Sequence, residues 1–155
     1  MIDKDLIVLD SDLSSKEDII RFLGKKADKL GYITDLDEYI KAVERREEEF
    51  STAVGYGISI PHGKSEAVKE EFIAFMRMKN PIIWGDKVDE PVRLVFMIGV
   101  PESKKGTTHL KILAQICKKL MDKDFRERLL KADQEQAYEL LMKIGKNIVS
   151  KEEAK

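Results

Sequence analysis

The chain has 155 residues, of which 43% are hydrophobic and 37% are charged, a composition typical of one globular domain with a charged surface. Its 28 Lys and Arg residues nearly balance 29 Asp and Glu residues, so the formal net charge of -1 creates no general attraction to nucleic acid. The sequence shows no signal-peptide pattern and no apolar run long enough to cross a bilayer, and its single cysteine cannot form an internal disulfide.

These bounds predict a cytoplasmic protein that neither binds nucleic acid nor inserts into a membrane. We expect one domain over residues 1–155, with a core at about 12–146 and a frayed tail at 150–155, since no internal repeat or low-complexity linker divides the chain.

The first third of the chain predicts two helices. Ser14 and Glu17 have the spacing of a capping box, and apolar residues then recur at helical spacing until Gly31 can end the helix. A second helix is expected to begin after Asp35 and to end near Glu49. Its apolar face consists of Leu36, Tyr39, Ile40 and Val43.

The middle of the chain predicts strands. Residues 58–60, Ile-Ser-Ile, predict a short strand that Pro61 interrupts, so His62 is expected just beyond the end of a strand. Residues 71–78 alternate weakly and predict a second strand, which the following Asn-Pro pair should stop. Residues 92–100 are almost continuously apolar, as in a strand covered on both faces.

The last third predicts three helices. Thr107 or Thr108 can cap the first, while Asp124 and Asp133 could each cap another. The first of these helices should turn Cys117 toward the core, together with Leu110, Leu113, Ile116 and Leu120. Strands that alternate with long helices indicate a layered α/β domain.

His62 is the first candidate for chemistry. Pro61 restricts the preceding backbone and Gly63 permits a sharp turn, so the imidazole should lie at a sheet edge with little covering it. A neutral imidazole is nucleophilic and titrates near neutral pH, which suits reversible acceptance of a phosphoryl group. Histidines next to proline and glycine also occur in ordinary turns, which is the alternative interpretation.

His109 and an arginine pair are the other candidates. In the first turn of a helix, a neutral His109 beside free N–H groups could help to hold a phosphate, although most histidines at such positions are plain surface residues. The Arg45-Arg46 pair could grip phosphate oxygens or could simply form ion pairs at a solvated helix end. The sequence holds no P-loop, no nucleophile elbow, no dinucleotide fingerprint and no metal-binding motif, so neither a cofactor nor a metal is expected.

One stretch links these candidates to a known family. The run Gly-Ile-Ser-Ile-Pro-His-Gly-Lys at residues 57–64 strongly resembles the phosphorylation-site segment of fructose–mannitol-type enzyme IIA domains of the bacterial sugar phosphotransferase system. The other matching segments are Arg46-Glu47, Ser51 to Gly55, Glu90 to Phe96, His109 to Leu113 and Phe125 to Leu130. The resemblance spans residues 12–144, roughly the whole chain.

The resemblance implies an α/β sandwich with a mixed central sheet and flanking helices, and a phosphotransferase component that works through a phosphohistidine. His62 matches the phosphorylated histidine, His109 the second active-site histidine, and Arg46 the arginine that faces the phosphate. The implied donor is the small carrier protein HPr, and the implied acceptor is a cysteine of an enzyme IIB domain on the way to sugar uptake. Contact with the membrane would be indirect, through IIB and IIC.

Two departures from the family pattern stand out. Ala53 replaces a frequent glycine, and Tyr56 replaces an asparagine or a similar polar residue. Neither position matches a phosphate ligand, so the phosphoryl chemistry is expected to be unchanged. Loop residues near the site shape the partner interface, so the two departures leave the sugar class open. Nitrogen-type regulatory relatives share the histidine motif, which leaves a second interpretation: a module whose phosphorylation at His62 controls its binding to a target protein.

Overall fold

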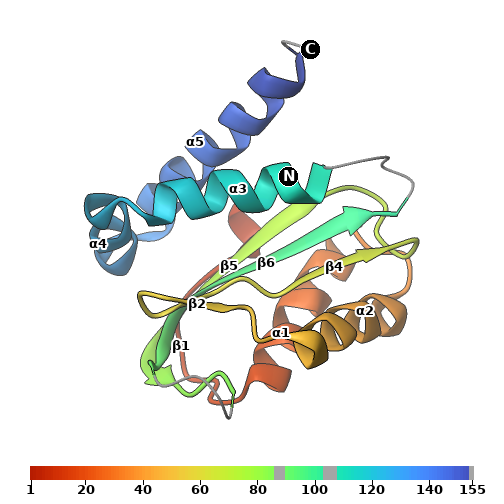
Figure 1. Cartoon of the computed structure of the whole chain (residues 1–155), viewed down its shortest axis with the longest axis horizontal. Coiled ribbons are helices and arrows are strands. Elements are labelled where there is room, and N and C mark those ends of the chain that lie inside the picture. Colours follow the sequence, from red (N-terminus) through yellow and green to blue (C-terminus); the bar gives the residue numbers. More distant parts are fainter. Residues whose placement is uncertain (86–89, 103–107, 154–155) are drawn as a thin grey trace.

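A computed structural model describes residues 1–85, 90–102 and 108–153 of the chain (Figure 1). The strands are β1 (Ile7–Ser11), β2 (Ala53–Gly55), β3 (Ile58–Ser59), β4 (His62–Ser65), β5 (Phe72–Ile82) and β6 (Val92–Pro101). The helices are α1 (Lys16–Lys29), α2 (Leu36–Glu49), α3 (Thr108–Leu120), α4 (Lys123–Lys131) and α5 (Gln134–Glu153), with a short 3-10 helix at Lys4–Leu6. The predicted α/β fold with a mixed sheet between helices is confirmed.

The sheet contains six strands, in the order β1-β5-β6-β3-β2, with β4 also paired to β6. Strand β6 runs antiparallel to β5 but parallel to both β3 and β4. Along one side, β6 therefore pairs first with β3 and then with β4, so the residues between these two short strands lie at a break in the sheet edge.

Helices cover both faces of the sheet, as Figure 1 shows. Alternate residues of β5 point to opposite sides, because side chains in a strand alternate. Phe72, Ala74 and Met76 enter a first core beneath α1 and α2, whereas Ile73 and Phe75 enter a second core beneath α3, α4 and α5. The continuous apolar run at residues 92–100 is confirmed as a strand buried on both faces.

The caps of the first two helices follow the sequence closely. Asp35 caps α2 as predicted, and its side chain accepts a hydrogen bond from the Glu38 backbone N–H. The capping residue of α1 is Ser15, one position after the predicted Ser14, and it accepts from the Asp18 N–H. Both serines can cap a helix, so sequence spacing alone does not choose between them.

Among the C-terminal helices, the structure differs from the sequence prediction in the capping residue of α4. Asp122, not Asp124, caps α4, because its carboxylate reaches the N–H two residues later. Asp133 does precede α5 as predicted and exchanges hydrogen bonds with Gln136 in a capping box. α5 then continues to Glu153, through most of the segment that the sequence assigns to a tail. Thr107, one of the two predicted caps of α3, lies outside the described residues.

Two strand boundaries also differ. β5 does not stop at Asn80-Pro81 but runs to Ile82, because its pairing with β6 shifts register after Arg77 and no ladder N–H is required at Pro81. Strand β1, which pairs with β5 in parallel, was not predicted from the sequence. Cys117, expected in the core, is exposed on α3, and its partial burial raises the pKa of the thiol.

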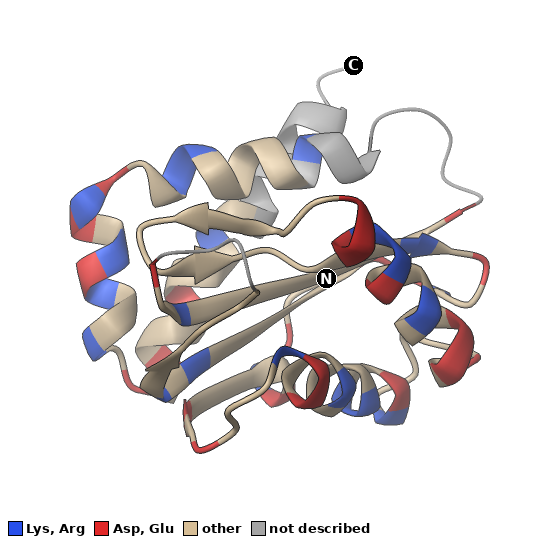
Figure 2. Cartoon of the chain, turned by 60° about the horizontal axis from the view of Figure 1, so that its bottom comes forward, with Lys and Arg blue, Asp and Glu red and all other residues tan. Residues whose placement is uncertain are grey.

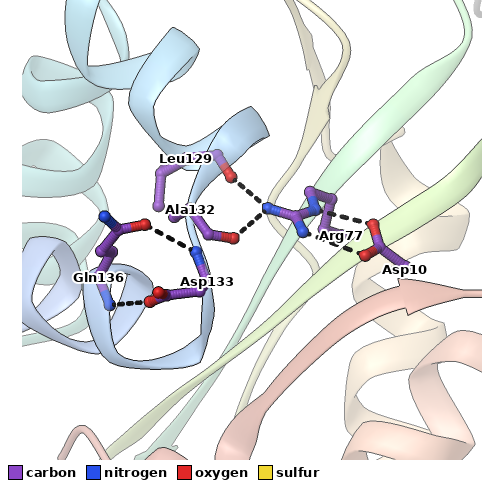
Figure 3. Close-up of polar contacts among 6 residues, drawn as sticks. All are labelled: Asp10, Arg77, Leu129, Ala132, Asp133 and Gln136. Carbon is purple, nitrogen blue, oxygen red and sulfur yellow. Dashed lines mark hydrogen bonds and ion pairs between the residues drawn. The ribbon is translucent and has the colours of Figure 1, made fainter.

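A buried arginine ties the second helical layer to the sheet (Figure 3). Arg77 on β5, 7% exposed, donates through Nη1 to the carbonyls of Leu129 and Ala132 at the end of α4. Its Nε and Nη2 donate to both carboxylate oxygens of Asp10, at 3.0 and 3.2 Å. The guanidinium thus donates two hydrogen bonds to Asp10 of β1 and two to the end of α4, so the arginine joins β1, β5 and α4.

Charges of both signs alternate along the outer helices, and the sheet is largely uncharged (Figure 2). No helix among the described residues is long and apolar enough to span a membrane. Within the same residues, no three His, Cys, Asp or Glu side chains are grouped as they would need to be to hold a metal ion.

Candidate functional site

His62 lies where the sheet edge is interrupted. As predicted, it lies just beyond a short strand, since β3 ends at Ser59, but it is the first residue of β4 and not a loop residue. Ile58 pairs with Leu94 and His62 with Ile98, so β3 and β4 keep one register along β6 on either side of the break. Pro61 causes the break, because it has no N–H to donate, although its carbonyl still accepts from the Ile98 N–H at 3.0 Å.

The ring of His62 contacts a backbone carbonyl two residues earlier in the chain. Its Nδ1 lies 2.8 Å from the carbonyl oxygen of Ile60. A carbonyl can only accept, so this contact is a hydrogen bond when Nδ1 carries the proton. The neutral ring then has its lone pair on Nε2, which is the nucleophilic nitrogen of this tautomer, and the side chain is half-buried.

The alternation of side chains along the strand determines on which face of the sheet the His62 side chain lies. Ile58 and Ile60 enter the second core, whereas Gly63 lies against α2 on the opposite face. His62 therefore lies on the face that carries α3, α4 and α5. In Figure 1, α3 begins at the end of the sheet toward which β4 and β6 run.

The helix that carries Arg46 packs against β4 from the other face of the sheet. Val43 and Tyr39 of α2 pack directly against Gly63, the neighbour of His62, and Arg46 follows Val43 in the last turn of the helix. The Arg46 side chain is half-buried, and its Nη1 donates to the Phe50 carbonyl at 2.9 Å. Arg45 is exposed, so the two arginines of the pair differ in surroundings.

His109 is the second residue of α3, as predicted for a first-turn position. Its side chain lies outside the described part of the structure, as does the whole segment 103–107 that leads to it. The structure thus brings the elements that carry His62 and Arg46 together, and the predicted approach of the two histidine rings stays a prediction.

Sequence reasoning missed a buried carboxylate beside this site. Glu47 is 8% exposed and accepts hydrogen bonds from the Thr52 N–H, the Thr52 hydroxyl and the Trp84 indole N–H. A signal was present, because Glu47 lies four residues after Val43 and so falls on the apolar face of α2. A charged residue on such a face requires buried partners.

Exposed apolar side chains surround the break. Phe50, which ends α2, is 76% exposed, and Val54 and Tyr56 of the adjoining hairpin are also largely exposed. Tyr56 stacks beneath Arg126 of α4 at 4.2 Å, which attaches the hairpin to the second helical layer. A cavity of about 470 Å³ lies elsewhere, between α4 and α5, with Arg128 and Lys143 among its lining residues.

Comparison with known proteins gives a consistent result. A family model described as "Phosphoenolpyruvate-dependent sugar phosphotransferase system, EIIA 2" matches residues 1–144. The fructose-specific EIIA component of the phosphotransferase system of Haloferax volcanii is 40% identical over 132 residues, which cover 85% of each chain.

Two solved structures share the fold over nearly the whole chain. The nitrogen regulatory protein IIA-Ntr from Neisseria meningitidis has a TM-score of 0.81 at 28% identity and covers 90% of this chain and 94% of its own. Enzyme IIA-mannitol of Escherichia coli, solved in complex with phosphorylated enzyme IIB-mannitol, has a TM-score of 0.77 at 27% identity and covers 92% of this chain and 97% of its own.

Proposed function

Because the chain belongs to the EIIA 2 family of the phosphoenolpyruvate-dependent sugar phosphotransferase system, we propose that it is a phosphocarrier that holds its phosphoryl group on His62. The group arrives from the phosphohistidine of HPr and leaves to a cysteine of an enzyme IIB domain, in support of sugar uptake. The relative from Haloferax volcanii, named as fructose-specific, supports the transport role.

The observation that carries this proposal is the hydrogen bond between Nδ1 of His62 and the Ile60 carbonyl. It leaves the lone pair on Nε2, and that pair forms the new N–P bond while the N–P bond of the donor breaks. In the second step the cysteine sulfur attacks phosphorus, and Nε2 recovers its lone pair. The carrier ends each cycle unchanged.

Two further residues stabilise the charge of the moving group. The guanidinium of Arg46 pairs with phosphoryl oxygens as the group passes between donor and acceptor. His109, in its neutral form at the N-terminal end of α3, donates a hydrogen bond to the same oxygens without becoming phosphorylated. Both roles rest on the match of these residues to the family motif.

The partners of this reaction are proteins, and the surface near His62 suits them. Phe50, Val54 and Tyr56 expose apolar area on the segments that flank the break in the sheet edge. The solved complex of the similar IIA-mannitol with IIB-mannitol supports a IIB domain as one partner. A carrier between HPr and IIB works in the cytoplasm and meets the membrane only through IIB and IIC.

A regulatory role is the second candidate, favoured by the likeness to IIA-Ntr at a TM-score of 0.81. In that case phosphorylation of His62 would change the affinity for a target protein, and no IIB domain would accept the group. The chemistry at His62 is the same in both cases.

The test is reconstitution with enzyme I, HPr and phosphoenolpyruvate, followed by intact-mass measurement and incubation with a panel of purified IIB domains. We expect one phosphate adduct that is labile in acid and stable in base, as phosphohistidine is, and that transfers to a IIB domain. His62→Ala should fold with a stability change of no more than roughly 1 kcal/mol and should take up no phosphate. Full labelling of His62→Ala would overturn the assignment, and labelling without transfer to any IIB domain would favour the regulatory role.

A further inference from the structure

The proposed phosphotransfer leaves the buried carboxylate of Glu47 without a role. This side chain sits in the last turn of α2, next in sequence to Arg46, and is 8% exposed. A carboxylate removed from water is retained at low cost only where hydrogen bonds replace its hydration. Three donors do so here, two from Thr52 and one from the Trp84 indole at 3.2 Å.

A continuous series of hydrogen bonds leads from Glu47 to the ring of His62. The Thr52 backbone is held by the carboxylate, and the Thr52 carbonyl accepts from the Ile60 N–H at 2.9 Å. The Ile60 carbonyl in turn accepts from Nδ1 of His62 at 2.8 Å. Because Pro61 interrupts the sheet at this point, Thr52 supplies the anchor for the Ile60 N–H.

We propose that Glu47 is a positioning residue for His62: its buried carboxylate fixes Thr52, Thr52 fixes Ile60, and the Ile60 carbonyl holds the ring proton on Nδ1. The inference rests on the proposed function in that Nε2 of His62 accepts the phosphoryl group. It adds a residue that never touches the phosphate but sets which ring nitrogen carries the proton.

The chemical consequence concerns the tautomer. A histidine side chain without neighbours favours the proton on Nε2, where it blocks attack on phosphorus. The Ile60 carbonyl reverses this preference only while it stays within hydrogen-bond distance of Nδ1. If the anchor at Thr52 loosens, part of the population returns to the Nε2–H form, and the rate of phosphoryl acceptance falls with the loss of the reactive tautomer.

Two variants separate this role from simple stabilisation. Thr52→Val and Trp84→Phe each remove one hydrogen-bond donor to Glu47, but only Thr52 lies on the path to His62. Trp84 is 1% exposed in the first core, so its loss should cost more folding stability than the nearly isosteric change at Thr52. A merely structural role for Glu47 therefore predicts that Trp84→Phe is the more harmful variant for phosphotransfer.

The positioning role predicts the opposite order. Thr52→Val should accept phosphate from phospho-HPr about threefold to tenfold more slowly at an unchanged KM for HPr, which is the loss expected for one hydrogen bond. Thr52→Ser, which keeps the hydroxyl, should recover most of the rate. Trp84→Phe should stay within about twofold of the parent protein once both variants are shown to be folded by circular dichroism.

A second measurement is independent of phosphotransfer. The ¹⁵N chemical shifts of the His62 ring report its tautomer, and the chain has only 2 histidines, so His62→Ala identifies the signals. We expect Nδ1 protonated in the parent and in Trp84→Phe, with a shift toward Nε2–H in Thr52→Val. A parent-like tautomer in Thr52→Val overturns the positioning role, as does equal slowing in both variants. If the parent protein takes up no phosphate, the proposed function fails while the tautomer comparison still decides the role of Glu47.

Discussion

At the scale of single residues, Pro61 determines how His62 is presented. The proline removes one N–H from the edge of the sheet, so the chain leaves β6 after β3 and rejoins it at His62 in the same register. The backbone of His62 is therefore fixed by pairing with β6, and its ring Nδ1 lies within hydrogen-bond distance of the Ile60 carbonyl. A histidine in an unpaired loop would lack both constraints.

Tyr56 shows why this position of the family often holds asparagine. Its φ of 56° lies in the left-handed region, between two glycines that also have positive φ. Asparagine tolerates that conformation better than most residues, whereas a tyrosine there requires compensation. The stacked guanidinium of Arg126 and the hydrogen bond from the Tyr56 N–H to Glu90 supply contacts that hold the turn.

Arg46 and Arg45 form a matched pair of residues for testing the electrostatic role. Arg46 is half-buried in the last turn of α2, three residues after the Val43 that packs against Gly63, whereas Arg45 is exposed. We expect Arg46→Ala to slow phosphoryl transfer from phospho-HPr by about 10-fold to 1,000-fold, because one charge-stabilising contact is lost in the transition state. Arg46→Lys should recover only part of the rate, since an ammonium cannot pair with two oxygens as a planar guanidinium does.

Arg45→Ala is the control for this experiment and should change the rate little. Single-turnover kinetics on the three variants measure the effect directly. A larger loss in Arg45→Ala than in Arg46→Ala would show that the other arginine faces the phosphate.

Replacing His109 is expected to slow the transfer of the phosphoryl group from His62 to a IIB domain. His109→Ala should still accept phosphate on His62 but should pass it to a IIB domain more slowly, because its hydrogen bond matters most as charge redistributes. His109→Gln, which can donate a hydrogen bond, should recover part of the rate. Transfer from His109→Ala at the parent rate, or a structure that places the two rings more than about 10 Å apart, would contradict a shared phosphate site.

At the scale of secondary-structure elements, α2 controls the position of β4. Gly63 lies so close to α2 that an added Cβ would stand 3.0 Å from a Val43 methyl carbon, 3.2 Å from the Tyr39 ring and 3.3 Å from the Val43 backbone nitrogen. The Tyr39 hydroxyl also donates to the carbonyl of Ile98, the strand partner of His62. A shift of the helix therefore moves the strand that carries the histidine.

Gly63→Ala tests this contact. We expect a loss of about 1–3 kcal/mol in the free energy of unfolding, measured by urea denaturation, because α2 must move away from β4 to admit the methyl group. Gly85→Ala is the control, since no atom of the described residues lies within 4 Å of its added Cβ, and should stay within about 0.5 kcal/mol of the parent. Equal stabilities of the two variants would show that α2 adapts without cost.

The elements that the sequence predicted correctly share one property. α2, α5 and β6 have caps or apolar periods that are complete within a short stretch of chain, and all three were confirmed. β4 and β1 were missed because their four or five residues carry too little periodic signal and are defined by the strands beside them. The extension of β5 through Pro81 likewise depends on how β6 pairs with it.

At the scale of the whole molecule, Arg77 joins the sheet to the second helical layer (Figure 3). The hydrogen bonds that Asp10 accepts from Arg77 hold the pKa of this carboxyl below the usual aspartate value of 3.8. A carboxyl whose pKa is lower in the folded state binds fewer protons than in the unfolded chain. Its contribution to stability is complete above pH 3.8 and disappears as the pH falls through the folded-state pKa.

Asp10→Asn should therefore lower stability at neutral pH and make the remaining stability fall less steeply below pH 3.8 than in the parent protein. Urea denaturation at a series of pH values measures both effects. Asp12→Asn is the control, because Asp12 meets Lys79 only at 3.8 Å with both side chains well exposed. If the free energy of unfolding falls equally steeply below pH 3.8 in the parent and in Asp10→Asn, the Asp10–Arg77 pair adds nothing to folding stability.

From its sequence alone, the chain could be assigned an α/β fold, most of its helices, its central strand and a histidine in the phosphorylation-site motif. These features depend on residues close together along the chain, where caps, apolar spacing and a proline act locally. Only the tertiary structure decided which ring nitrogen of His62 lies against the Ile60 carbonyl, that the buried Glu47 accepts a hydrogen bond from Trp84, and that Arg77 joins two layers. Glu47 and Arg77 find hydrogen-bond partners far along the chain, and the ring contact of His62 depends on how the backbone turns between two strands, so none of the three leaves a periodic pattern in the sequence.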